Sequence, residues 1–476
     1  MTVQPPQKTV AVVGSGMAGL VSAYLLRNDK KHRFEVEVFE TQDRLSLDSA
    51  SFTVPAEPDR QAPAKDRVDM PMRAFAGGFY DNLRRMYDYL GVKYISPRFI
   101  YALSAYSQDE PEGEAASYYI HSSNNHRMPP LRPEGPSLAA WILEICYLAL
   151  CYYWFTVCCF LVTPKAGDGS GEEDETLREY LKRIRIPQYY SKKYLLPLMS
   201  SVTTCTHDAL LDFPAIDIVE YERRTYGKPH YTVIGGVHQL QSRLSKGQKV
   251  KFGATVTAIE NVRTQVQVSW TDAASGQSNS ALFDYVIMAV TPNVVGEIFQ
   301  PLRTAMAFVP TVNVESVIHR DFTRIQSCRQ HLNQILQSTP EPTTASHNFT
   351  APQPIHICSA LDSPVTESIH EHPSSVLVST WPIGPIDPTK VLHRTRFVRV
   401  LRTPKSREVV NRIFAVNHPR YSAETDDKQQ LWRNGDGNVF LVGGWCWDGM
   451  VMLEGCIVSA IRVADSLGVE VPWVVN

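Results

Sequence analysis

A glycine-rich turn near the start of the chain constrains the fold more than any other feature of the sequence. Residues 9–13 (TVAVV) form a β-branched, apolar run, and a GxGxxG motif follows at once, before a helix-like stretch at residues 20–27. In such a strand–turn–helix unit, Gly14 permits the tight turn and Gly16 lets the backbone approach a pyrophosphate. Gly19 lets the helix pack closely on the strand, and the helix N-terminus offers unpaired N–H groups to the phosphates. The motif therefore predicts a Rossmann-type nucleotide-binding unit.

The residues after the first helix strengthen this prediction. A second apolar strand is expected at residues 34–39, and it ends at Glu40. A carboxylate at this place can hold the ribose hydroxyls of adenosine and would repel a 2′-phosphate, so NADP is disfavoured. FAD and NAD both stay open on the motif alone, as does a glycine-rich turn in some other α/β unit.

Size and composition describe a globular enzyme of two joined domains. The chain has 476 residues, of which 43% are hydrophobic and 20% charged, with a formal net charge of -2. A chain of this length exceeds what one hydrophobic core usually serves. The balanced charge lacks the basic field that nucleic-acid binding requires, so we expect no DNA or RNA partner.

The first residues and the cysteines indicate the compartment. Residues 1–8 are short and polar and lead directly into a strand, without the charged and apolar regions of a secretion signal. We therefore expect an intracellular protein, cytoplasmic or peripherally membrane-associated, in which the glycosylation triplet at residues 348–350 is not used. The nine cysteines include no CxxC pair with zinc spacing, which favours reduced, buried thiols and no metal site.

One apolar run has three interpretations. Residues 145–162 contain no charged side chain and are long enough to cross a membrane. A single span would place two parts of one folded unit on opposite sides of a bilayer. We favour a buried core helix, with contact at the membrane interface through residues 138–162 as the second interpretation and a true span as the third.

Further elements follow along the chain. The pattern predicts a helix at Asp81–Leu90 that stops at Gly91, strands at residues 249–259 and 265–270, and a buried strand at residues 285–290. Near the C-terminus a strand is expected before the glycine pair at residues 443–444, and a helix at residues 453–467. Polar, aperiodic stretches at residues 105–136 and 164–175, and much of 337–374, are expected to be surface loops or insertions.

These blocks, in this order, resemble the flavin-containing amine oxidoreductase superfamily, which includes amine oxidases, phytoene desaturases and protoporphyrinogen oxidases. Within it the chain looks most like the group described as predicted NAD/FAD-binding proteins. The resemblance covers nearly the whole chain, and its most specific pieces are residues 14–19 with Glu40 and Arg44, residues 68–69 with the helix at 80–91, residues 233–236 (VIGG), residues 418–419 (HP) and residues 443–455.

The resemblance implies an α/β fold in which a Rossmann-like FAD-binding domain, with a parallel sheet and a β-meander, is interleaved with a mixed-sheet and helical substrate domain. The FAD-binding domain would comprise residues 1–80, 231–300 and 426–476. The substrate domain would comprise residues 81–230 and 301–425.

The resemblance also implies that FAD is the cofactor and lies extended across the first domain. Its pyrophosphate would rest on the glycine turn, and the final block would cover the flavin ring, with the N-terminus of the last helix directed at the edge where reduced flavin carries negative charge. Two roles stay open for Arg73: a position on the surface, or a contact with the cofactor or the substrate. The cofactor-binding candidates are Gly14, Ser15, Gly16, Met17, Ala18, Gly19, Glu40, Arg44, Arg73, Val256, Gly444 and Glu454.

Several positions depart from the family pattern. The glycine pair expected after Arg44 is replaced by residues 45–47 (LSL), Pro71 stands where a glycine is expected, and the final loop lacks a histidine. A second GxGxxG unit is not found, because the glycines at residues 167–171 precede an acidic run and open no apolar helix. Reduction of the flavin by its substrate, followed by reoxidation by oxygen or a quinone, therefore fits better than reduction by a nicotinamide.

The sequence thus predicts an FAD-dependent oxidoreductase that dehydrogenates, desaturates or oxidises a small hydrophobic substrate. Trp381, Trp445 and Trp447 are candidates for an apolar substrate pocket, with core packing as their alternative role. An amine oxidase, a redox-neutral double-bond isomerase and a non-catalytic flavin-binding protein at a membrane surface stay open. No catalytic base is singled out, because flavin chemistry requires mainly positioning from the protein.

Overall fold

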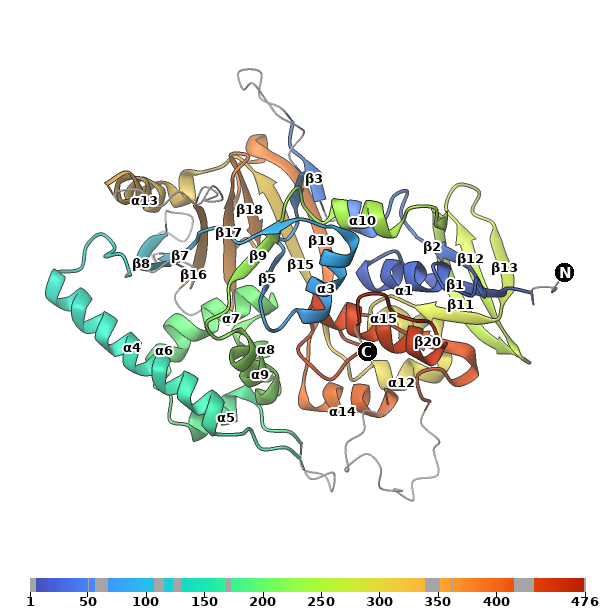
Figure 1. Cartoon of the computed structure of the whole chain (residues 1–476). Helices are drawn as coiled ribbons and strands as arrows, with labels where there is room; N and C mark the ends of the chain where they lie inside the picture. Colours follow the sequence, from blue (N-terminus) through green and yellow to red (C-terminus); the bar gives the residue numbers. More distant parts are fainter. Residues whose placement is uncertain are drawn as a thin grey trace.

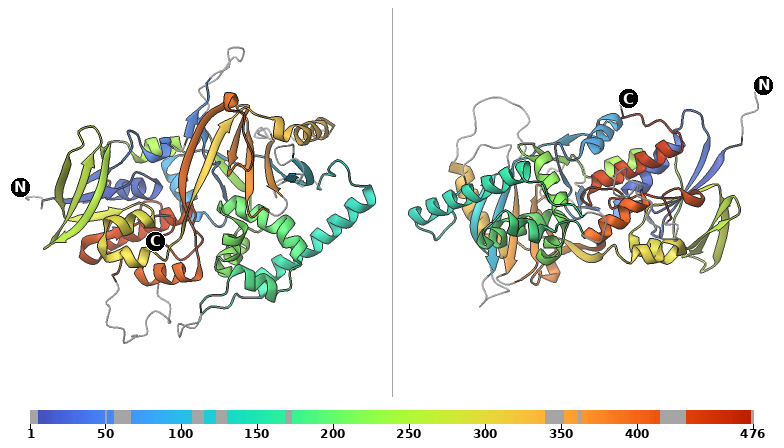
Figure 2. Two further views of the ribbon diagram at one scale, coloured as in Figure 1. Left: turned by 180° about the vertical axis from the view of Figure 1, so that it is seen from behind. Right: turned by 90° about the horizontal axis from the view of Figure 1, so that it is seen from below.

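The computed structural model describes residues 6–49, 51–55, 67–106, 115–122, 130–167, 173–338, 352–360, 363–414 and 432–474. Two halves lie side by side along the long direction of the molecule (Figures 1 and 2). One half is built on a parallel sheet with a β-meander, and the other on a larger mixed sheet with a group of helices. The predicted fold class is therefore confirmed. Residues 348–350 and 418–419 lie outside the described ranges.

The parallel sheet gathers strands from three separate stretches of the chain. Its order is β10-β2-β1-β14-β20, and every neighbouring pair is parallel. The strands are β1 (Lys8–Val13), β2 (Phe34–Phe39), β10 (Lys249–Lys251), β14 (Tyr285–Met288) and β20 (Val439–Leu441). These stretches are consistent with the predicted interleaving, whose exact boundaries stay predictions.

The two faces of this sheet are covered by different layers. Val10 and Val12 pack in the cluster that holds α1 (Met17–Arg27) and α15 (Leu453–Ser466), whereas Ala11 and Val13 pack with the meander. Because both faces are covered, β1 reads as a continuous apolar run rather than an alternating one. The meander consists of β11 (Ala254–Val262), β12 (Gln265–Asp272) and β13 (Ser278–Phe283).

The second half is organised by a seven-stranded sheet with the order β19-β15-β18-β17-β16-β7-β8. We call it the substrate sheet, after the substrate domain that the sequence predicts for these residues. Its pairs are antiparallel except for β16 with β7. The strands are β7 (Phe99–Tyr106), β8 (Ala116–Ser122), β15 (Thr311–His319), β16 (Gln353–Ala360), β17 (Thr366–His372), β18 (Val376–Thr380) and β19 (Val391–Val400).

This sheet corrects part of the sequence analysis. The stretches expected to be loops contain β8, β16 and β17, so that expectation was wrong for these residues. The polar side chains that suggested loops are buried in pairs: His370 lies 3.0 Å from Gln353, and Glu367 accepts a hydrogen bond from Tyr106 at 3.1 Å. Paired polar groups are tolerated inside a sheet, and they erase the alternating pattern by which a strand is recognised.

Short elements connect the two halves, and helices cover the substrate sheet on one side (Figure 1). The helix at Asp81–Leu90 (α3) is confirmed, with Gly91 in the left-handed region at φ 66°. The other short strands are β3 (Ser51–Thr53), β4 (Arg67–Asp69), β5 (Ala74–Ala76), β6 (Tyr94–Ile95) and β9 (His230–Val233). The remaining α-helices are α2 (Ser46–Ser49), α4 (Leu138–Leu161), α5 (Leu177–Arg183), α6 (Gln188–Tyr190), α7 (Leu196–Thr203), α8 (His207–Leu211), α9 (Ala215–Thr225), α10 (His238–Leu244), α11 (Pro292–Ile298), α12 (Arg303–Met306), α13 (Gln326–Ser338) and α14 (Pro404–Ile413).

The long apolar run is one helix, α4, at the outer edge of the molecule (Figure 1). Within the described residues it is the one helix long and apolar enough to cross a membrane, judged by length and composition. A buried core helix, the favoured interpretation, is wrong for its outer face, where Leu143, Leu150 and Leu161 are 70–78% exposed. Its cysteines divide accordingly: Cys146 is exposed, whereas Cys151, Cys158 and Cys159 are buried and free. Periodicity could not reveal this, because both faces are apolar.

Candidate cofactor-binding site

The glycine turn between β1 and α1 is closely packed on one side. Gly14 has a φ of 102°, and a Cβ atom there would lie 2.7 Å from the carbonyl oxygen of Ala289. A Cβ atom on Gly19 would collide with the carbonyl oxygen of Gly14. Gly14 is therefore required by the turn and by the close approach of the segment after β14, and Gly19 by the packing of the helix against the turn. The motif predicted the tight turn and the close helix packing.

Gly16 differs from its two neighbours in the motif. Its φ is −66°, an ordinary value, and a Cβ atom there would meet nothing within 4 Å. It is the N-cap residue of α1, where no side chain caps the helix and no acidic residue stands in the first turn. An uncapped helix N-terminus beside open space is a place where a phosphate can approach backbone N–H groups.

Glu40 ties the second strand to this turn. Its buried carboxylate accepts hydrogen bonds from Ser15 N at 3.1 Å and Gln42 N at 3.0 Å, and also from the Ser15 hydroxyl. Ser46 N in turn donates to the Ser15 hydroxyl at 2.9 Å. The residues that replace the usual glycine pair after Arg44 are thus bound to the glycine turn. Glu40 lies beside the turn, and its contact with the ribose stays a prediction.

The other side of the site is formed where the Gly443–Gly444 turn meets the first residues of α15. A Cβ atom on Gly455 would lie 2.5 Å from the Gly444 carbonyl oxygen, and one on Gly444 would lie 2.9 Å from Met452 O. The Cys456 thiol is placed near both Ala18 N and Gly444 N; burial, the largest effect, raises its pKa to about 11. The N-termini of α1 and α15 therefore converge on one place, although 437 residues separate Ala18 and Gly455 in sequence number.

Glu454 has a structural contact that the sequence did not predict. Its buried carboxylate accepts hydrogen bonds from Asn82 N at 2.9 Å, Asn82 Nδ2 at 2.8 Å and Leu83 N at 3.0 Å. These are N–H groups at the start of α3, so Glu454 caps that helix from outside. Burial raises the pKa of Glu454, and the two backbone bonds oppose the rise. Its placement near the flavin ring stays a prediction, and its observed role is to hold α3 against α15.

Arg73 lies close to Asp69 and to Cys456. Its Nε atom is buried and has no hydrogen-bond partner among the described residues. Its charge opposes the burial that raises the pKa of Asp69 to about 6, and it lowers the pKa of Cys456. Asp69 also accepts hydrogen bonds from Val237 N, which joins two blocks of the family pattern. A cationic group with an unused buried donor close to Cys456 is suited to an anionic cofactor.

Two other cofactor candidates are placed less closely. Arg44 is 61% exposed in its side chain and pairs with Asp43 at 3.3 Å, an interaction of little consequence for stability. Val256 lies in β11, which begins beside Glu40 through the hydrogen bond from Ala254 N to Glu40 O at 2.9 Å. Contact of either residue with the cofactor stays a prediction.

Two of the three candidate tryptophans are buried in the loop after β20. The Trp445 indole donates to Val290 O at 3.2 Å and the Trp447 indole to Met450 O at 3.0 Å. The fully buried Arg402 holds this loop by donating to the carbonyl oxygens of Trp445, Trp447 and Gly449. Trp381 lies elsewhere, at the end of β18, where its N–H bonds to Glu315 O. The structure therefore joins Trp445 with Trp447 and separates Trp381 from them.

Three residues around the site were missed by the sequence analysis. Phe79 packs edge-to-face against Trp447 at 5.8 Å between ring centroids, and the neighbouring Tyr80 is fully surrounded, so that burial raises its pKa. Arg399 reaches the same region and donates to Thr203 O and Val451 O at 2.7 Å. The sequence could have indicated Phe79 and Tyr80 by their position immediately before the predicted helix at Asp81–Leu90. Arg399 has no such signal, because it is one of several basic residues in a strand.

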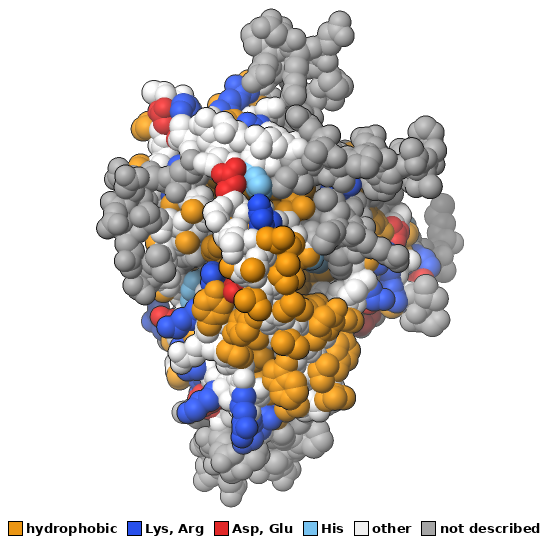
Figure 3. Space-filling model, turned by 90° about the vertical axis from the view of Figure 1, so that its left-hand side faces the viewer, with side chains coloured by type: hydrophobic (Ala, Val, Ile, Leu, Met, Phe, Trp, Pro, Cys, Tyr) orange, Lys and Arg blue, Asp and Glu red, His pale blue; other side chains and the backbone are white. Residues whose placement is uncertain are grey.

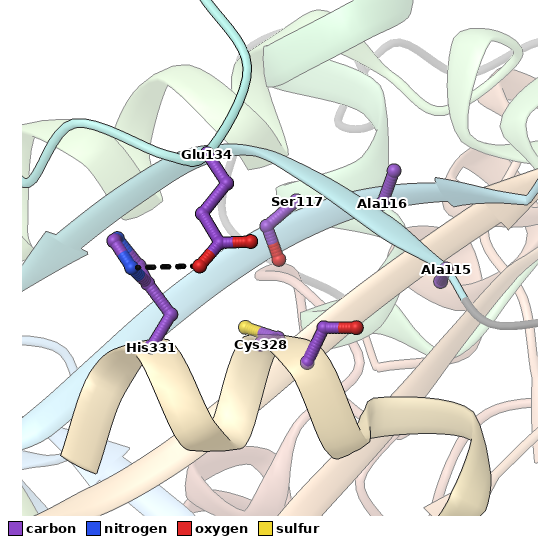
Figure 4. A pocket seen from close by; sticks show the side chains of 7 residues that line it. Ala115, Ala116, Ser117, Glu134, Cys328 and His331 are labelled. Atoms are coloured by element: carbon purple, nitrogen blue, oxygen red, sulfur yellow. Dashed lines mark ion pairs between the residues drawn. The ribbon is translucent and has the colours of Figure 1, made fainter. Parts of the chain in front are cut away.

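A small cavity elsewhere is separate from this site. It has a volume of about 230 Å³ and lies between β8 and α13 (Figure 4). Its lining includes Ser117, Cys328 and His331, and Glu134 lies 3.5 Å from His331 Nδ1 across it. It lies at the far edge of the substrate sheet from the glycine turn (Figure 1). Among the described residues no group of three or more His, Cys, Asp or Glu side chains is arranged for a metal ion.

The parallel sheet, its glycine turn and the convergence of the two helix N-termini define a nucleotide-binding protein of the Rossmann type. Comparison with known families agrees: residues 12–90 match the NAD(P)-binding Rossmann-like domain, and residues 201–467 match the flavin containing amine oxidoreductase family. The second match covers more than half of the chain, and the protein belongs to that family. The cofactor is FAD, and the residues present fit it: open space at Gly16, an uncapped helix and the free donor of Arg73.

A solved structure of the same fold is the CLA-producing fatty acid isomerase from P. acnes. The two chains superpose with a TM-score of 0.58 at 11% sequence identity, over 96% of this chain and 98% of the other. At that identity the likeness concerns the fold. No curated protein sequence matches the chain significantly.

Proposed function

We propose that this protein is an FAD-dependent oxidoreductase that dehydrogenates or oxidises a small hydrophobic substrate. The observation that carries the proposal is the convergence of the two helix N-termini, with Gly16 facing open space and Cys456 between them. When bound, FAD supplies the redox chemistry by accepting a hydride at N5. Family membership supports an oxidoreductase of this type.

The residues of the chain would divide the work of holding the cofactor. The N–H groups at the start of α1 would face the pyrophosphate across Gly16, and Glu40 would face the ribose hydroxyls. Arg73 would balance negative charge. The N-terminus of α15, held in place by the bonds of Glu454 to α3, would stabilise negative charge on the reduced ring.

The site also accounts for a reaction without a charged catalytic base. Burial raises the pKa of Cys456 to about 11 and raises that of Tyr80, so both stay protonated at neutral pH. Phe79, Tyr80 and Trp447 exclude water around the final loop. An aromatic wall that excludes water favours an apolar substrate and transfer of hydride from a C–H bond.

A redox-neutral double-bond isomerase is a second candidate. The P. acnes protein of the same fold is a fatty acid isomerase, and the two chains align over nearly their whole lengths. An isomerase would use the same cofactor site and return the hydride to another carbon of its substrate. The two candidates differ in whether an external electron acceptor is consumed.

The first test is the absorbance spectrum of the purified full chain, before and after acid denaturation. Bands near about 375 and 450 nm, with about one FAD released per chain, are expected. Anaerobic mixing with unsaturated fatty acids, polyenes and, separately, primary amines should then bleach the 450-nm band for one class. Bleaching by amines alone would replace the proposal with an amine oxidase.

Product analysis separates the remaining outcomes. A product two hydrogens lighter than its substrate, with consumption of oxygen or a quinone, supports the oxidoreductase. A product of unchanged mass, formed without an acceptor, supports the isomerase. A chain that holds no flavin and cannot be reconstituted with FAD would contradict both.

A further inference from the structure

The outer face of α4 is the largest concentration of exposed apolar side chains in the described part of the molecule. Ten of the twenty large hydrophobic side chains that are exposed lie on this one helix, so the patch is not a scatter of single residues. Figure 3 shows a large, continuous hydrophobic area on this side of the molecule. The ten are Leu138, Ile142, Leu143, Leu150, Tyr152, Tyr153, Trp154, Val157, Phe160 and Leu161. A helix of 24 residues is about 36 Å long, so the patch is extended.

The inner face of α4 is attached to the protein along its length. Near its start, Glu144 accepts a hydrogen bond from Tyr189 at 2.8 Å and lies 3.9 Å from Lys193 Nζ. In the second half, Thr156 donates to Glu222 at 3.2 Å. Trp154 stands at the border of the two faces: half of its side chain is exposed, and its indole donates to Ile184 O at 2.8 Å.

The end of the helix is held in the same way. Arg223 of α9 donates to Cys159 O, and Tyr180 of α5 donates to Val162 O at 3.0 Å. A membrane-spanning helix needs lipid or other apolar helices on every side, and these charged and polar partners exclude that for α4 in this fold. The helix can expose its outer face while it lies parallel to a surface.

Basic side chains border the patch. Arg185 directly follows Ile184, whose carbonyl binds Trp154, and Lys192 lies in the segment that packs Tyr189 against Tyr147. Both are exposed, and so is Lys182 of α5. None of the three makes an ion pair with any residue that the structure describes. Figure 3 shows Lys and Arg side chains beside and below the apolar area. Residues 145–161, in contrast, contain no charged side chain.

We propose that the outer face of α4 lies in the interface of an anionic lipid membrane, with the helix parallel to the bilayer and Arg185, Lys192 and Lys182 facing the lipid headgroups. An apolar face with Tyr and Trp among its members and cations at its border is the chemistry of interfacial attachment. A second copy of the chain would bring two identical sets of cations together, and this favours the lipid surface. The inference is independent of the reaction at the flavin.

The test uses the full flavin-loaded chain and sedimentation with vesicles. Vesicles of phosphatidylcholine with about 30% phosphatidylserine should bind the protein, and pure phosphatidylcholine should bind it at least about tenfold more weakly. Leu143→Glu with Leu150→Glu should reduce binding to the anionic vesicles by at least about tenfold and leave the melting temperature unchanged. The matched control is Leu282→Glu, a side chain 48% exposed on the meander, which should bind like the wild type.

Two further measurements separate the parts of the proposal. Arg185→Glu with Lys192→Glu should weaken binding to anionic vesicles severalfold without changing the weak binding to neutral ones. Wild-type binding by the Leu143→Glu, Leu150→Glu protein would overturn the proposal. A stable dimer that this pair of substitutions dissociates, in a protein that binds no vesicles, would also overturn it and assign the face to a second copy.

Discussion

The parallel sheet and the seven-stranded sheet are stabilised by different interactions. Around β1 the core is apolar and the limiting contacts are between backbone atoms, as at Gly14 and Gly19. The substrate sheet instead buries charged and polar groups: Arg324 lies 3.4 Å from Glu367, and His356 lies 2.8 Å from Glu371. The packing around the parallel sheet depends on glycines that have no side chain. The packing of the substrate sheet depends on buried polar side chains that have partners.

This difference teaches where each half tolerates change. A glycine in close backbone contact has no neighbour that can move aside, whereas a buried ion pair can be replaced when both partners change together. A single substitution at such a glycine of the parallel sheet should therefore destabilise the protein with no second substitution to relieve it. In the substrate sheet, a second substitution in the partner residue should restore part of the lost stability. The four predictions below test this contrast, in order of their expected effect on the free energy of unfolding.

The largest effect is expected from Gly19→Val. A side chain there would collide with the Gly14 carbonyl oxygen, a backbone atom fixed by the turn. We expect a loss of more than about 5 kcal/mol, enough to prevent folding. Soluble yield and urea denaturation measure it, and a variant with the wild-type midpoint would show that the turn is not close-packed.

The next effect is expected from Arg324→Met. Arg324 is buried beside Glu367, and its guanidinium also lies over the Tyr106 ring at 4.4 Å. Loss of the cation would leave a buried carboxylate with fewer partners, at a cost of about 3–5 kcal/mol. Urea denaturation of Arg324→Met with Glu367→Gln should show recovery of part of this loss. If the loss in the double variant equals the sum of the losses of Arg324→Met and Glu367→Gln measured separately, the two side chains are not coupled.

A smaller, pH-dependent effect is expected from His356. Burial opposes its protonation, but the neighbouring Cys328 and Glu371 side chains together raise its pKa to about 9. Because this folded-state pKa exceeds the ordinary value of about 6.5, its contribution is fully present below pH 6.5 and is lost as pH rises through about 9.

The measurement is urea denaturation of wild type and His356→Gln between pH 6 and pH 10. The wild type should lose about 1–3 kcal/mol over this range relative to the variant. Parallel curves for the two proteins would show that folding does not shift the pKa of His356.

The smallest effect on stability is expected from Gly16→Val, which has the largest effect on function. A Cβ atom there meets no protein atom within 4 Å and φ is ordinary, so the cofactor-free protein should unfold within about 1 kcal/mol of wild type. FAD binding should be abolished, because the side chain occupies the approach of the pyrophosphate. A variant that purifies with full flavin occupancy would contradict this placement of the cofactor.

Much of the cofactor half could be predicted because its signals are local. The run at residues 9–13, the three glycines and Glu40 lie within 32 residues, and each has a backbone reason that needs no distant partner. The strands of the substrate sheet were harder, since polar residues such as Gln353 and His370 resemble loop residues until their partners across the sheet are known.

The sequence by itself determined the nucleotide-binding turn, because φ angles, close approaches and helix termini are encoded within a few residues. Its resemblance to the flavin-containing amine oxidoreductases indicated the family and the cofactor. The tertiary structure decided what depends on distant segments. It assigned Glu454 to the start of α3, placed Cys456 beside Ala18, and left the outer face of α4 uncovered while α9 covers the inner one. An apolar helix reads alike on both faces, and only the packing of other segments decides which face meets solvent.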